Sequence, residues 1–364
     1  MTPGAGPRIV VVMPRNMSFG PRRASSIDLC AYDFVRTSRY RETTTVVAEH
    51  VDEPFEGLAV STYPKGDKRA QVARIAALSP DLIVVHQHVP SAMRIARQIR
   101  DVPVIVHRHN AIKPPSWLGS RLRYRWIYGH LAGLIFVSDF CTEHFRAAWP
   151  RLQLPVVTVH NALEMGPWQP RGPEDRERVI AYTGRLDPLK GIVELAEALP
   201  QVLAERPDWR AHLVLSRQDR WPSLRPEVEA RIAPVAGQVD LSFDVPFARV
   251  VEVLSSAAIA VVPTVSEEPF GRAALEAMAG GAALASAMTG GLPEVVGDCA
   301  VPVDPITPMV LAGALGRLCD DDALRGALAV RGLDRARAGF ELADKSAEID
   351  AFYDRVLAER RVAA

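Results

Sequence analysis

Short apolar runs alternate along the chain with longer stretches in which apolar residues recur at helical spacing. In the first half of the chain these runs lie at residues 8–14, 43–49, 81–87, 102–108, 133–139 and 155–161. Runs that are apolar on both faces are typical of strands in a parallel sheet that helices cover on both sides. Helical patterns such as 67–78 and 91–100 fall between them. This order predicts a doubly wound α/β sheet.

The pattern breaks at residues 162–177, which are rich in proline, glycine and charged residues and predict an interdomain linker. A second series follows, with strands predicted at 178–184, 210–216, 238–243, 257–264 and 282–288. A chain of 364 residues also exceeds what one hydrophobic core usually supports. We therefore expect two Rossmann-like domains, over residues 1–165 and 166–340. Residues 341–364 predict a C-terminal helix, for which packing back on the N-terminal domain is one arrangement.

Composition and charge narrow the class of protein. The chain is 48% hydrophobic with a formal net charge of zero, so it has no global charge that would attract nucleic acid. Its four cysteines are far apart in sequence, which argues against a zinc site or a disulfide framework and fits a reducing cytoplasm. No stretch approaches the roughly 20 apolar residues of a membrane span, and the N-terminal apolar run is too short for a signal peptide. We expect a cytoplasmic protein.

Two glutamates stand out in the sequence SEEPFGRAALEAMAGG at residues 266–281. Glu268 lies in the loop after a predicted strand, whereas Glu276 lies in the second turn of the following helix. Between them are the backbone N–H groups of the helix N-terminus, those of Phe270, Gly271 and Arg272. Such a terminus suits a phosphate group, and neighbouring carboxylates accept hydrogen bonds from hydroxyl groups. The segment suits a ligand with a phosphate and a sugar; a capped helix with two surface glutamates is the alternative.

A second polar segment, YTGRLDPLKG at residues 182–191, follows the first strand of the second domain. Arg185 and Lys190 flank a tight Asp-Pro turn and can converge on one anion, and Gly184 permits close approach. An arginine fork with a lysine point charge suits a diphosphate. A solvated turn is the alternative. Both segments follow strands of the same sheet, however, so both would face the cleft between the domains, where open α/β sheets bind ligands.

The segments GRLDPLKG, EEPFGRAALEAMAGG and TGGLPEVVGD (289–298) resemble, in order and spacing, the C-terminal domain of the retaining GT-B glycosyltransferases of family 4. The resemblance covers about residues 178–300. It implies the GT-B fold, with an N-terminal acceptor-binding domain and a C-terminal nucleotide-sugar-binding domain. It also implies an enzyme that transfers a hexose with retention from a UDP- or GDP-sugar to a glycan or lipid-linked acceptor, in the synthesis of a cell-surface polysaccharide or glycolipid.

Within the second domain the resemblance assigns Arg185 and Lys190 to the donor diphosphate. Departure of a nucleoside diphosphate builds negative charge on phosphate oxygens, which these cations and the helix N-terminus at Arg272 can stabilise. The reaction is therefore expected to need no metal and no other cofactor, with the leaving phosphate accepting the proton of the acceptor. The sequence CDDDA at residues 319–323 contains the Asp-x-Asp metal motif of another glycosyltransferase fold. It precedes a helical stretch, so we predict an N-cap cluster there.

The remaining donor contacts fall on two short segments. Glu276 is implied to bind the ribose, and Glu268 is implied to lie against the donor sugar with help from the amides of the turn that follows it. The nucleobase is implied to rest on the backbone of FDVPF (243–247), around Val245. Because these base contacts are mostly main-chain, the side chains do not select one base.

In the first domain, PVIVHRHN at residues 103–110 ends a predicted strand. Family members often carry a histidine at this place that faces the donor sugar, and His109 fits it best. His107 would share the same face of the strand and is the alternative. We assign Arg108, together with His107, to acceptor binding.

The first loop departs from the family pattern. The family tends to have a Gly-Gly pair there, whereas residues 14–26 contain a single glycine, Gly20, and three arginines. Arg15, Arg22 and Arg23 either face an anionic acceptor or are solvated. We assign Arg15, Gly20 and Arg22 to the acceptor side.

Residues 102–138 contain no aspartate or glutamate, and basic and aromatic residues are interleaved within 113–130. This combination suits an anionic membrane surface or a lipid-linked phosphate, which would place the protein at the inner face of the cell membrane. An ordinary helix whose tryptophans and tyrosines pack while its arginines extend to solvent is the alternative.

Two other functions fit the same motifs. A sugar-nucleotide epimerase on this fold would need no acceptor, and a non-catalytic subunit would bind a sugar nucleotide without transferring it. The joint presence of Arg185, Lys190, Glu268 and Glu276 argues against the non-catalytic subunit, because such a subunit has no chemical need for all four.

Overall fold

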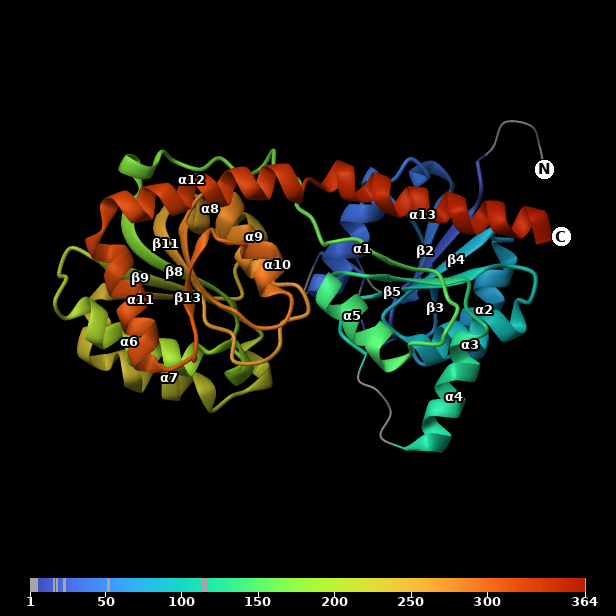
Figure 1. Ribbon diagram of the computed structural model, residues 1–364, viewed down its shortest axis with the longest axis horizontal. Coiled ribbons are helices and arrows are strands. Elements are labelled where there is room, and N and C mark those ends of the chain that lie inside the picture. Colours follow the sequence, from blue (N-terminus) through green and yellow to red (C-terminus); the bar gives the residue numbers. More distant parts are fainter. Residues whose placement is uncertain are drawn as a thin grey trace. The chain divides into compact units, whose positions relative to one another are not determined.

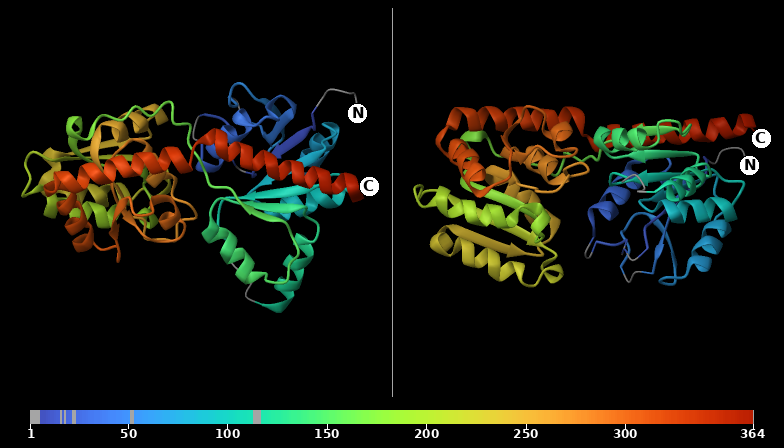
Figure 2. Two further views of the ribbon diagram at one scale, coloured as in Figure 1. Left: turned by 45° about the horizontal axis from the view of Figure 1, so that its top comes forward. Right: turned by 60° about the horizontal axis from the view of Figure 1, so that its bottom comes forward.

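The computed structural model describes residues 6–15, 17, 19–21, 24–50, 53–112 and 117–363, with the side chains of 360–363 excepted. The chain forms two compact units, Met1–Ala162 with Leu342–Ala364 and Leu163–Glu341 (Figure 1). Each unit has one sheet in which every described pairing is parallel, and helices cover both faces of each sheet (Figure 2). The predicted doubly wound α/β architecture is confirmed.

The first unit contains a sheet of strand order β3-β2-β1-β4-β5-β6-β7. Its strands are β1 Ile9–Val12, β2 Thr44–Glu49, β3 Ala59–Tyr63, β4 Leu82–His86, β5 Val104–Arg108, β6 Gly133–Phe136 and β7 Val156–Thr158. Its helices are α1 Ser26–Thr37, α2 Lys68–Ala77, α3 Val89–Gln98, α4 Leu118–Tyr128, α5 Asp139–Ala148 and α13 Leu342–Ala363. The central strands β1 and β4 are buried at every position, as the apolar residues that make up all of β1 and all of β4 except His86 predict.

The last helix, α13, belongs to the first unit and runs beside α1 (Figure 1). Asp350 of α13 accepts hydrogen bonds from the Ser38 hydroxyl at 2.6 Å and the Arg39 backbone N–H at 2.9 Å, at the C-terminal end of α1. Phe352 packs against Gly133, where a Cβ atom would lie 2.6 Å from the phenyl ring. The C-terminal helix therefore completes the core that β1 and α1 begin.

The second unit contains a sheet of strand order β10-β9-β8-β11-β12-β13. Its strands are β8 Glu177–Arg185, β9 Arg210–Ser216, β10 Val239–Phe243, β11 Ala257–Val262, β12 Ala283–Ala287 and β13 Ala300–Val303. Its helices are α6 Ile192–Leu203, α7 Leu224–Ile232, α8 Phe247–Ser256, α9 Arg272–Ala279, α10 Leu292–Val296, α11 Pro308–Asp320 and α12 Asp322–Gly339. Helix α12 begins at the predicted cap, because the Asp321 carboxylate accepts a hydrogen bond from the Leu324 backbone N–H at 2.8 Å.

The predicted linker, residues 162–177, packs against the second unit over much of its length. Trp168 is 4% exposed and lies edge to face with Phe247. The Arg176 guanidinium is buried and donates hydrogen bonds of 2.7–3.0 Å to four backbone carbonyl groups, those of Arg171, Leu254, Ala257 and Gly280. Burial, and then the charge of Arg171, lowers the pKa of Arg176 to about 10. A single side chain thus satisfies carbonyls from three separate chain segments.

We expect Arg176→Met to lower the free energy of unfolding by roughly 2–3 kcal/mol or more, because buried carbonyls lose a charged donor. The control is Arg178→Met, which removes a guanidinium that is half-exposed and paired with Asp208. That surface pair should contribute about 0–1 kcal/mol. Urea unfolding followed by circular dichroism compares the two. Equal losses in the two variants would contradict the role of Arg176.

Candidate functional site

The loop after β8 brings the predicted cations to the carboxyl edge of the second sheet. Arg185 is the last residue of β8, and its guanidinium lies 3.4 Å from the carboxylate of buried Asp187. Asp187 also accepts a hydrogen bond of 3.1 Å from the Leu189 backbone N–H, which shapes the turn Pro188–Lys190. Lys190 then leads into Gly191, whose φ of +69° begins α6.

Lys190 and Glu268 form an ion pair between the loops that follow β8 and β11. The Lys190 ammonium donates to the Glu268 carboxylate, and the side chains are only 22% and 17% exposed. Two backbone features hold the loops together. The Val265 N–H donates to the Leu189 carbonyl at 3.2 Å. A Cβ atom at Gly191 would lie 1.8 Å from the Pro263 carbonyl oxygen, so only glycine permits this approach.

The Gly-Gly pair of the third motif shapes the loop that carries Glu268. The Gly291 backbone N–H donates to the Glu268 carbonyl at 2.7 Å. Gly290 has φ of +63°, and a Cβ atom there would lie 2.2 Å from the same carbonyl oxygen. From the sequence, this motif was recognised only by its resemblance to the family. The structure explains the two glycines, because both lie against the backbone of Glu268.

Glu276 is held by Arg272 within the first turns of α9. The Arg272 guanidinium donates to the Glu276 carboxylate at 2.8 Å, and the side chains are 13% and 11% exposed. The guanidinium also lies 5.9 Å from the ring centroid of Phe247, the last residue of the 243–247 segment. Glu276, predicted to bind ribose, is therefore connected through Arg272 to the segment predicted to hold the base. Val245 in that segment is half-buried.

The turn between Glu268 and α9 is fixed by packing. Phe270 is 2% exposed and lies edge to face with Phe340 at 5.9 Å, so its ring belongs to the core of the second unit. Gly271 has φ of +105° and is the N-cap of α9. A Cβ atom there would lie 2.4 Å from Leu292. Any contact of Phe270 with a ligand must therefore be made by its backbone, as the sequence predicts.

Tyr182 was not predicted as part of the site. Its buried hydroxyl donates to the Arg185 carbonyl at 3.3 Å. Burial, and then the negative charge of Asp187, raises the pKa of Tyr182, while Arg185 lowers it and Glu268 raises it further. The hydroxyl therefore lies among the charged groups of the site. A Cβ atom at Gly184 would lie 2.8 Å from this hydroxyl, which explains the glycine.

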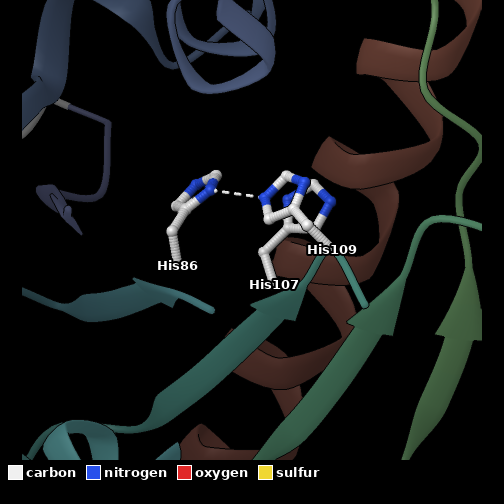
Figure 3. A group of neighbouring side chains, drawn as sticks. All are labelled: His86, His107 and His109. Atoms are coloured by element: carbon white, nitrogen blue, oxygen red, sulfur yellow. Dashed lines mark hydrogen bonds between the residues drawn. The ribbon is translucent and has the colours of Figure 1, made fainter. Parts of the chain in front are cut away.

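Three histidines form a buried cluster at the carboxyl edge of the first sheet (Figure 3). His107 and His109 share a strand face as predicted, with ring centroids 4.6 Å apart. His86, which the sequence analysis missed, ends β4 and pairs in register with His107. Its Nδ1 lies 2.9 Å from Nε2 of His109. Burial lowers the pKa of His86 to about 3 and lowers the pKa of the other two well below the usual range.

In the described part of the chain, the histidine cluster is one candidate for a metal site. One nitrogen atom from each of the three rings lies within 4.8 Å of the other two. Coordination requires each imidazole to offer a lone pair to the same point. The facing nitrogens of His86 and His109 instead lie at hydrogen-bond distance and share one proton. The geometry is that of a neutral hydrogen-bonded pair, which fixes the ring of His109 through a partner on the neighbouring strand.

The predicted acceptor residues lie on different parts of the first unit. Arg108 ends β5 between His107 and His109, and its guanidinium donates to the Gln87 carbonyl. Gly20 is buried, and a Cβ atom there would lie 2.1 Å from the Glu53 carbonyl oxygen, so backbone packing accounts for it. Arg15 is half-buried. The predicted Arg22 lies outside the described residues, as do residues 113–116 of the predicted membrane segment.

Helix α4 carries the described part of the predicted membrane segment. Three of its large apolar side chains and that of the preceding cap residue are exposed by 48–73%: Leu118, Leu122 and Trp126 on the helix, and Trp117 at the cap. Arg121, Arg123 and Arg125 are exposed on the same short helix. Among the described residues no helix is long and apolar enough to cross a bilayer.

Solved structures share this fold over almost the whole chain. The structure of Anabaena HepE in complex with UDP and glucose aligns with a TM-score of 0.77 at 20% identity, over 96% of this chain and 100% of that one. Sucrose-phosphate synthase from Thermosynechococcus elongatus aligns with a TM-score of 0.77 at 18% identity, over 97% and 100%. The two-sheet architecture is therefore that of the GT-B fold.

Sequence comparisons identify the family. Models described as Glycosyl transferases group 1 and Glycosyltransferase Family 4 match residues 177–321 and 22–165. A D-inositol 3-phosphate glycosyltransferase from Nocardioides sp. is 31% identical over 327 residues, covering 78% of this chain and 70% of that protein. The chain belongs to glycosyltransferase family 4.

Other relatives match over shorter segments. A D-inositol 3-phosphate glycosyltransferase from Corynebacterium glutamicum is 30% identical over 51% of this chain. An MMP alpha-(1->4)-mannosyltransferase from Mycolicibacterium hassiacum is 33% identical over 62% of it. The matched segments span about half the length of these relatives, 45% and 53% respectively.

The buried histidines predict a specific dependence of stability on pH. Unfolded imidazoles have a pKa near 6.5, whereas the folded cluster binds protons only at much lower pH. Below about pH 6.5 the unfolded state therefore binds more protons, and the free energy of unfolding should fall by up to roughly 1.4 kcal/mol per pH unit for each histidine.

We expect His107→Phe to reduce this slope, because it removes one titrating ring whose Nε2 has no hydrogen-bond partner in the described structure. His86→Phe should reduce the slope as well, but it should also lower the free energy of unfolding at neutral pH, because it breaks the hydrogen bond to His109. Urea unfolding between about pH 7.5 and pH 4.5 measures both effects. Identical slopes for His107→Phe and the unmodified protein would contradict the prediction.

Proposed function

We propose that the protein is a retaining glycosyltransferase that moves a hexose from a nucleotide diphosphate sugar to a glycan or lipid-linked acceptor. The observation that carries the proposal is the pairing of Lys190 with Glu268 and of Arg272 with Glu276 at one edge of the second sheet. Membership of family 4 supports it. The UDP in solved Anabaena HepE complexes of this fold makes a UDP-sugar the first donor to test, with a GDP-sugar second.

In this proposal the diphosphate lies near Arg185 and Lys190. The acceptor hydroxyl oxygen bonds to the anomeric carbon, and the bond from that carbon to the diphosphate oxygen breaks. The hydroxyl proton moves to the leaving diphosphate. Negative charge grows on the phosphate oxygens as the bond breaks, so cations that are already in position stabilise the transition state more than the ground state.

The proposed roles of the two glutamates follow from their different settings. Glu268 lies in a loop fixed by Gly290 and Gly291, which suits a carboxylate that must meet sugar hydroxyls at a set position. Glu276 lies on a helix and is buried, which suits a ribose contact. Donor hydroxyls can replace part of the hydrogen bonding that Lys190 and Arg272 now provide to these carboxylates.

His109 is proposed to contact the donor sugar as a neutral imidazole. Its Nε2 is engaged by His86, so Nδ1 is the ring nitrogen left for a hydroxyl of the sugar. If His86 Nδ1 holds the shared proton, His109 donates through Nδ1. If His109 Nε2 holds the proton, Nδ1 accepts instead. The His86–His109 pair can therefore meet either a hydrogen-bond donor or a hydrogen-bond acceptor on the sugar while both rings stay neutral.

Helix α4 supports a contact with an anionic membrane, which would place the enzyme at the cytoplasmic face of the cell membrane in polysaccharide or glycolipid synthesis. Exposed tryptophan and leucine can enter the headgroup region while Arg121, Arg123 and Arg125 attract anionic lipids. A sugar-nucleotide epimerase remains the alternative, because the donor residues alone suit it as well.

The reaction itself provides the first test. Purified protein is incubated with UDP- and GDP-hexoses and acceptor mixtures, and the anomeric configuration of the product is read by proton NMR. We expect a transferred hexose with the configuration of the donor. An inverted product would contradict retention, and conversion of the donor without an acceptor would identify the epimerase.

Lys190→Ala should lower kcat by roughly 10²–10³-fold, because it removes charge stabilisation that grows in the transition state. Glu276→Gln should instead raise the donor Kd about tenfold and change kcat less, because a contact with the ribose is equally strong in the ground state and the transition state. Lys65→Ala, at an exposed loop, is the control. Full activity in both site variants would exclude this donor site.

A further inference from the structure

The chain makes an uncommon backbone turn directly after β4. Gln87 has φ of +63°, in the left-handed region that favours glycine. The His88 N–H donates to the His86 carbonyl at 2.7 Å across this residue, so the three residues form a γ-turn of the rare kind with positive φ. Strained backbone of this kind persists only where the surrounding structure holds it, and it is concentrated at functional sites. Contacts around Gln87 must therefore hold it in this conformation.

Three hydrogen bonds join Gln87 to the end of β5. Its backbone N–H donates to the His107 carbonyl at 2.8 Å, and its backbone carbonyl accepts from the Arg108 guanidinium. Its side-chain oxygen Oε1 accepts from the His109 backbone N–H at 3.0 Å. The partners are three consecutive residues, so Gln87 connects the γ-turn to the point at which β5 leaves the sheet.

The bond to His109 takes the place of a bond of the sheet. Strands β4 and β5 are parallel, with His86 opposite His107. If this ladder continued by one residue, the His109 N–H would donate to the backbone carbonyl of Gln87. The carbonyl instead accepts from Arg108, and the amide oxygen of the Gln87 side chain accepts from the His109 N–H. The pairing of the two strands thus ends in a side-chain bond at the residue that is proposed to contact the donor sugar.

Two neighbouring residues of the turn hold His109. Nδ1 of His86 lies 2.9 Å from Nε2 of His109 and fixes the ring, whereas Gln87 fixes the backbone (Figure 3). A ring held at both its backbone and one nitrogen presents its other nitrogen, Nδ1, at a set place. Placement matters for the reaction, because a displacement of about 1 Å can lower a rate roughly 100-fold.

Helix α3 anchors the other side of the turn. His88 is the N-cap of this helix, and its ring Nδ1 accepts from the Ser91 backbone N–H at 3.2 Å. Helix α3 in turn packs against β5. The turn therefore lies between two elements that contact each other, which allows Gln87 to hold His109 instead of moving with it.

We propose that Gln87 is a positioning residue for glycosyl transfer. Its side-chain amide holds the backbone of His109, and thereby the imidazole that is proposed to contact the donor sugar. This inference rests on the proposed function and adds to it a residue that acts through another. Because the nucleotide part of the donor is assigned to residues of the second unit, Gln87 should affect reaction of the sugar and leave nucleotide binding unchanged.

The test uses variants of the full chain that separate the side-chain amide from the backbone turn. Gln87→Gly removes the amide and adopts φ of +63° more easily than glutamine does. Gln87→Asn tolerates the left-handed backbone, but its side chain is shorter by one methylene group. Gln87→Glu keeps an oxygen acceptor at the same length. Gln153→Gly, at an exposed loop position of the same unit, is the matched control.

Transfer is measured as release of UDP from UDP-glucose, or of GDP from GDP-mannose, with the acceptor mixtures of the first test. We expect Gln87→Gly and Gln87→Asn to lower kcat/KM about 10–100-fold. Gln87→Glu should keep about a third of kcat/KM or more, because a carboxylate oxygen accepts the same hydrogen bond. Gln153→Gly should match the unmodified protein, and the Kd of UDP or GDP should change less than about twofold in every variant.

Hydrogen exchange provides a measurement that does not depend on activity. The His109 backbone N–H loses its acceptor in Gln87→Gly and keeps one in Gln87→Glu. Its exchange with solvent should therefore be faster in Gln87→Gly than in Gln87→Glu or the unmodified protein.

A double-mutant cycle with His109→Ala tests whether Gln87 acts through His109. Single-turnover rates are measured, because they resolve transfer that is much slower than in the unmodified protein. Gln87→Gly should lower the rate about 10–100-fold when His109 is present, but less than about twofold in the His109→Ala background. A residue that only supports the fold would lower both rates by the same factor. If Gln87→Gly fails to fold, Gln87→Asn takes its place in the cycle.

The outcomes separate the two proposals. A loss that disappears in the His109→Ala background supports the positioning role. Full activity of Gln87→Gly and Gln87→Asn, equal losses in both backgrounds, or an unchanged exchange rate of the His109 N–H in Gln87→Gly overturns it. A loss in Gln87→Glu as large as that in Gln87→Gly also overturns it. All of these results leave transfer by the unmodified protein intact, whereas absence of both nucleotide binding and transfer in that protein overturns the proposed function and the positioning role together.

Discussion

The close approach of one backbone to another at glycine positions is the constraint on which the candidate donor site depends. Gly191 lets the turn after β8 contact the carbonyl of Pro263, and Gly290 lets the loop after β12 contact that of Glu268. With a side chain at either position, the loops would have to separate. Lys190 could then no longer meet Glu268, because its ammonium reaches the carboxylate only while the two loops touch. The ion pair is thus a consequence of backbone packing.

The candidate site residues of the two units differ in how their charges are paired. In the second unit the carboxylates of Glu268 and Glu276 are each matched by a cation, so the site is electrically balanced before a donor arrives. In the first unit the three clustered histidines are neutral, and Arg94 and Arg108 have no carboxylate partners in the described structure. A ligand that reaches Glu268 or Glu276 must therefore exchange existing interactions for new ones, whereas the Arg108 guanidinium has no counter-charge among the described residues.

Much of the fold and part of the site could be predicted from the sequence, because both depend on local patterns. The largely apolar central strands identified the two sheets, and the position of the two motifs after strands of one sheet predicted that Lys190 and Glu268 lie at the same sheet edge. Strand β3 was missed because it lies at an edge, is largely half-exposed and lacks an apolar run. Strand β13 was missed because it has only four residues and includes Pro302.

The missed site residues depend on contacts between distant segments. His86 ends β4, and the local sequence pattern does not show that β5 is the neighbouring strand. The hydrogen bond between His86 and His109 could therefore not be predicted from the sequence. Tyr182 reads as one more apolar position of a buried strand, and only its place beneath the turn shows its relation to Arg185. Arg176 lay in a segment predicted as a linker, although its guanidinium is part of the second unit's core.

The return of the chain to the first unit through α13 has a consequence for synthesis on the ribosome. Residues 163–341 form the second unit and are all made before α13 emerges. Until then the first unit lacks Ile349, Phe352 and Tyr353, which help to close its core. The second unit is complete earlier, so the N-terminal part of the chain is the last to reach its final packing. Order of translation and order of completion are therefore reversed in this protein.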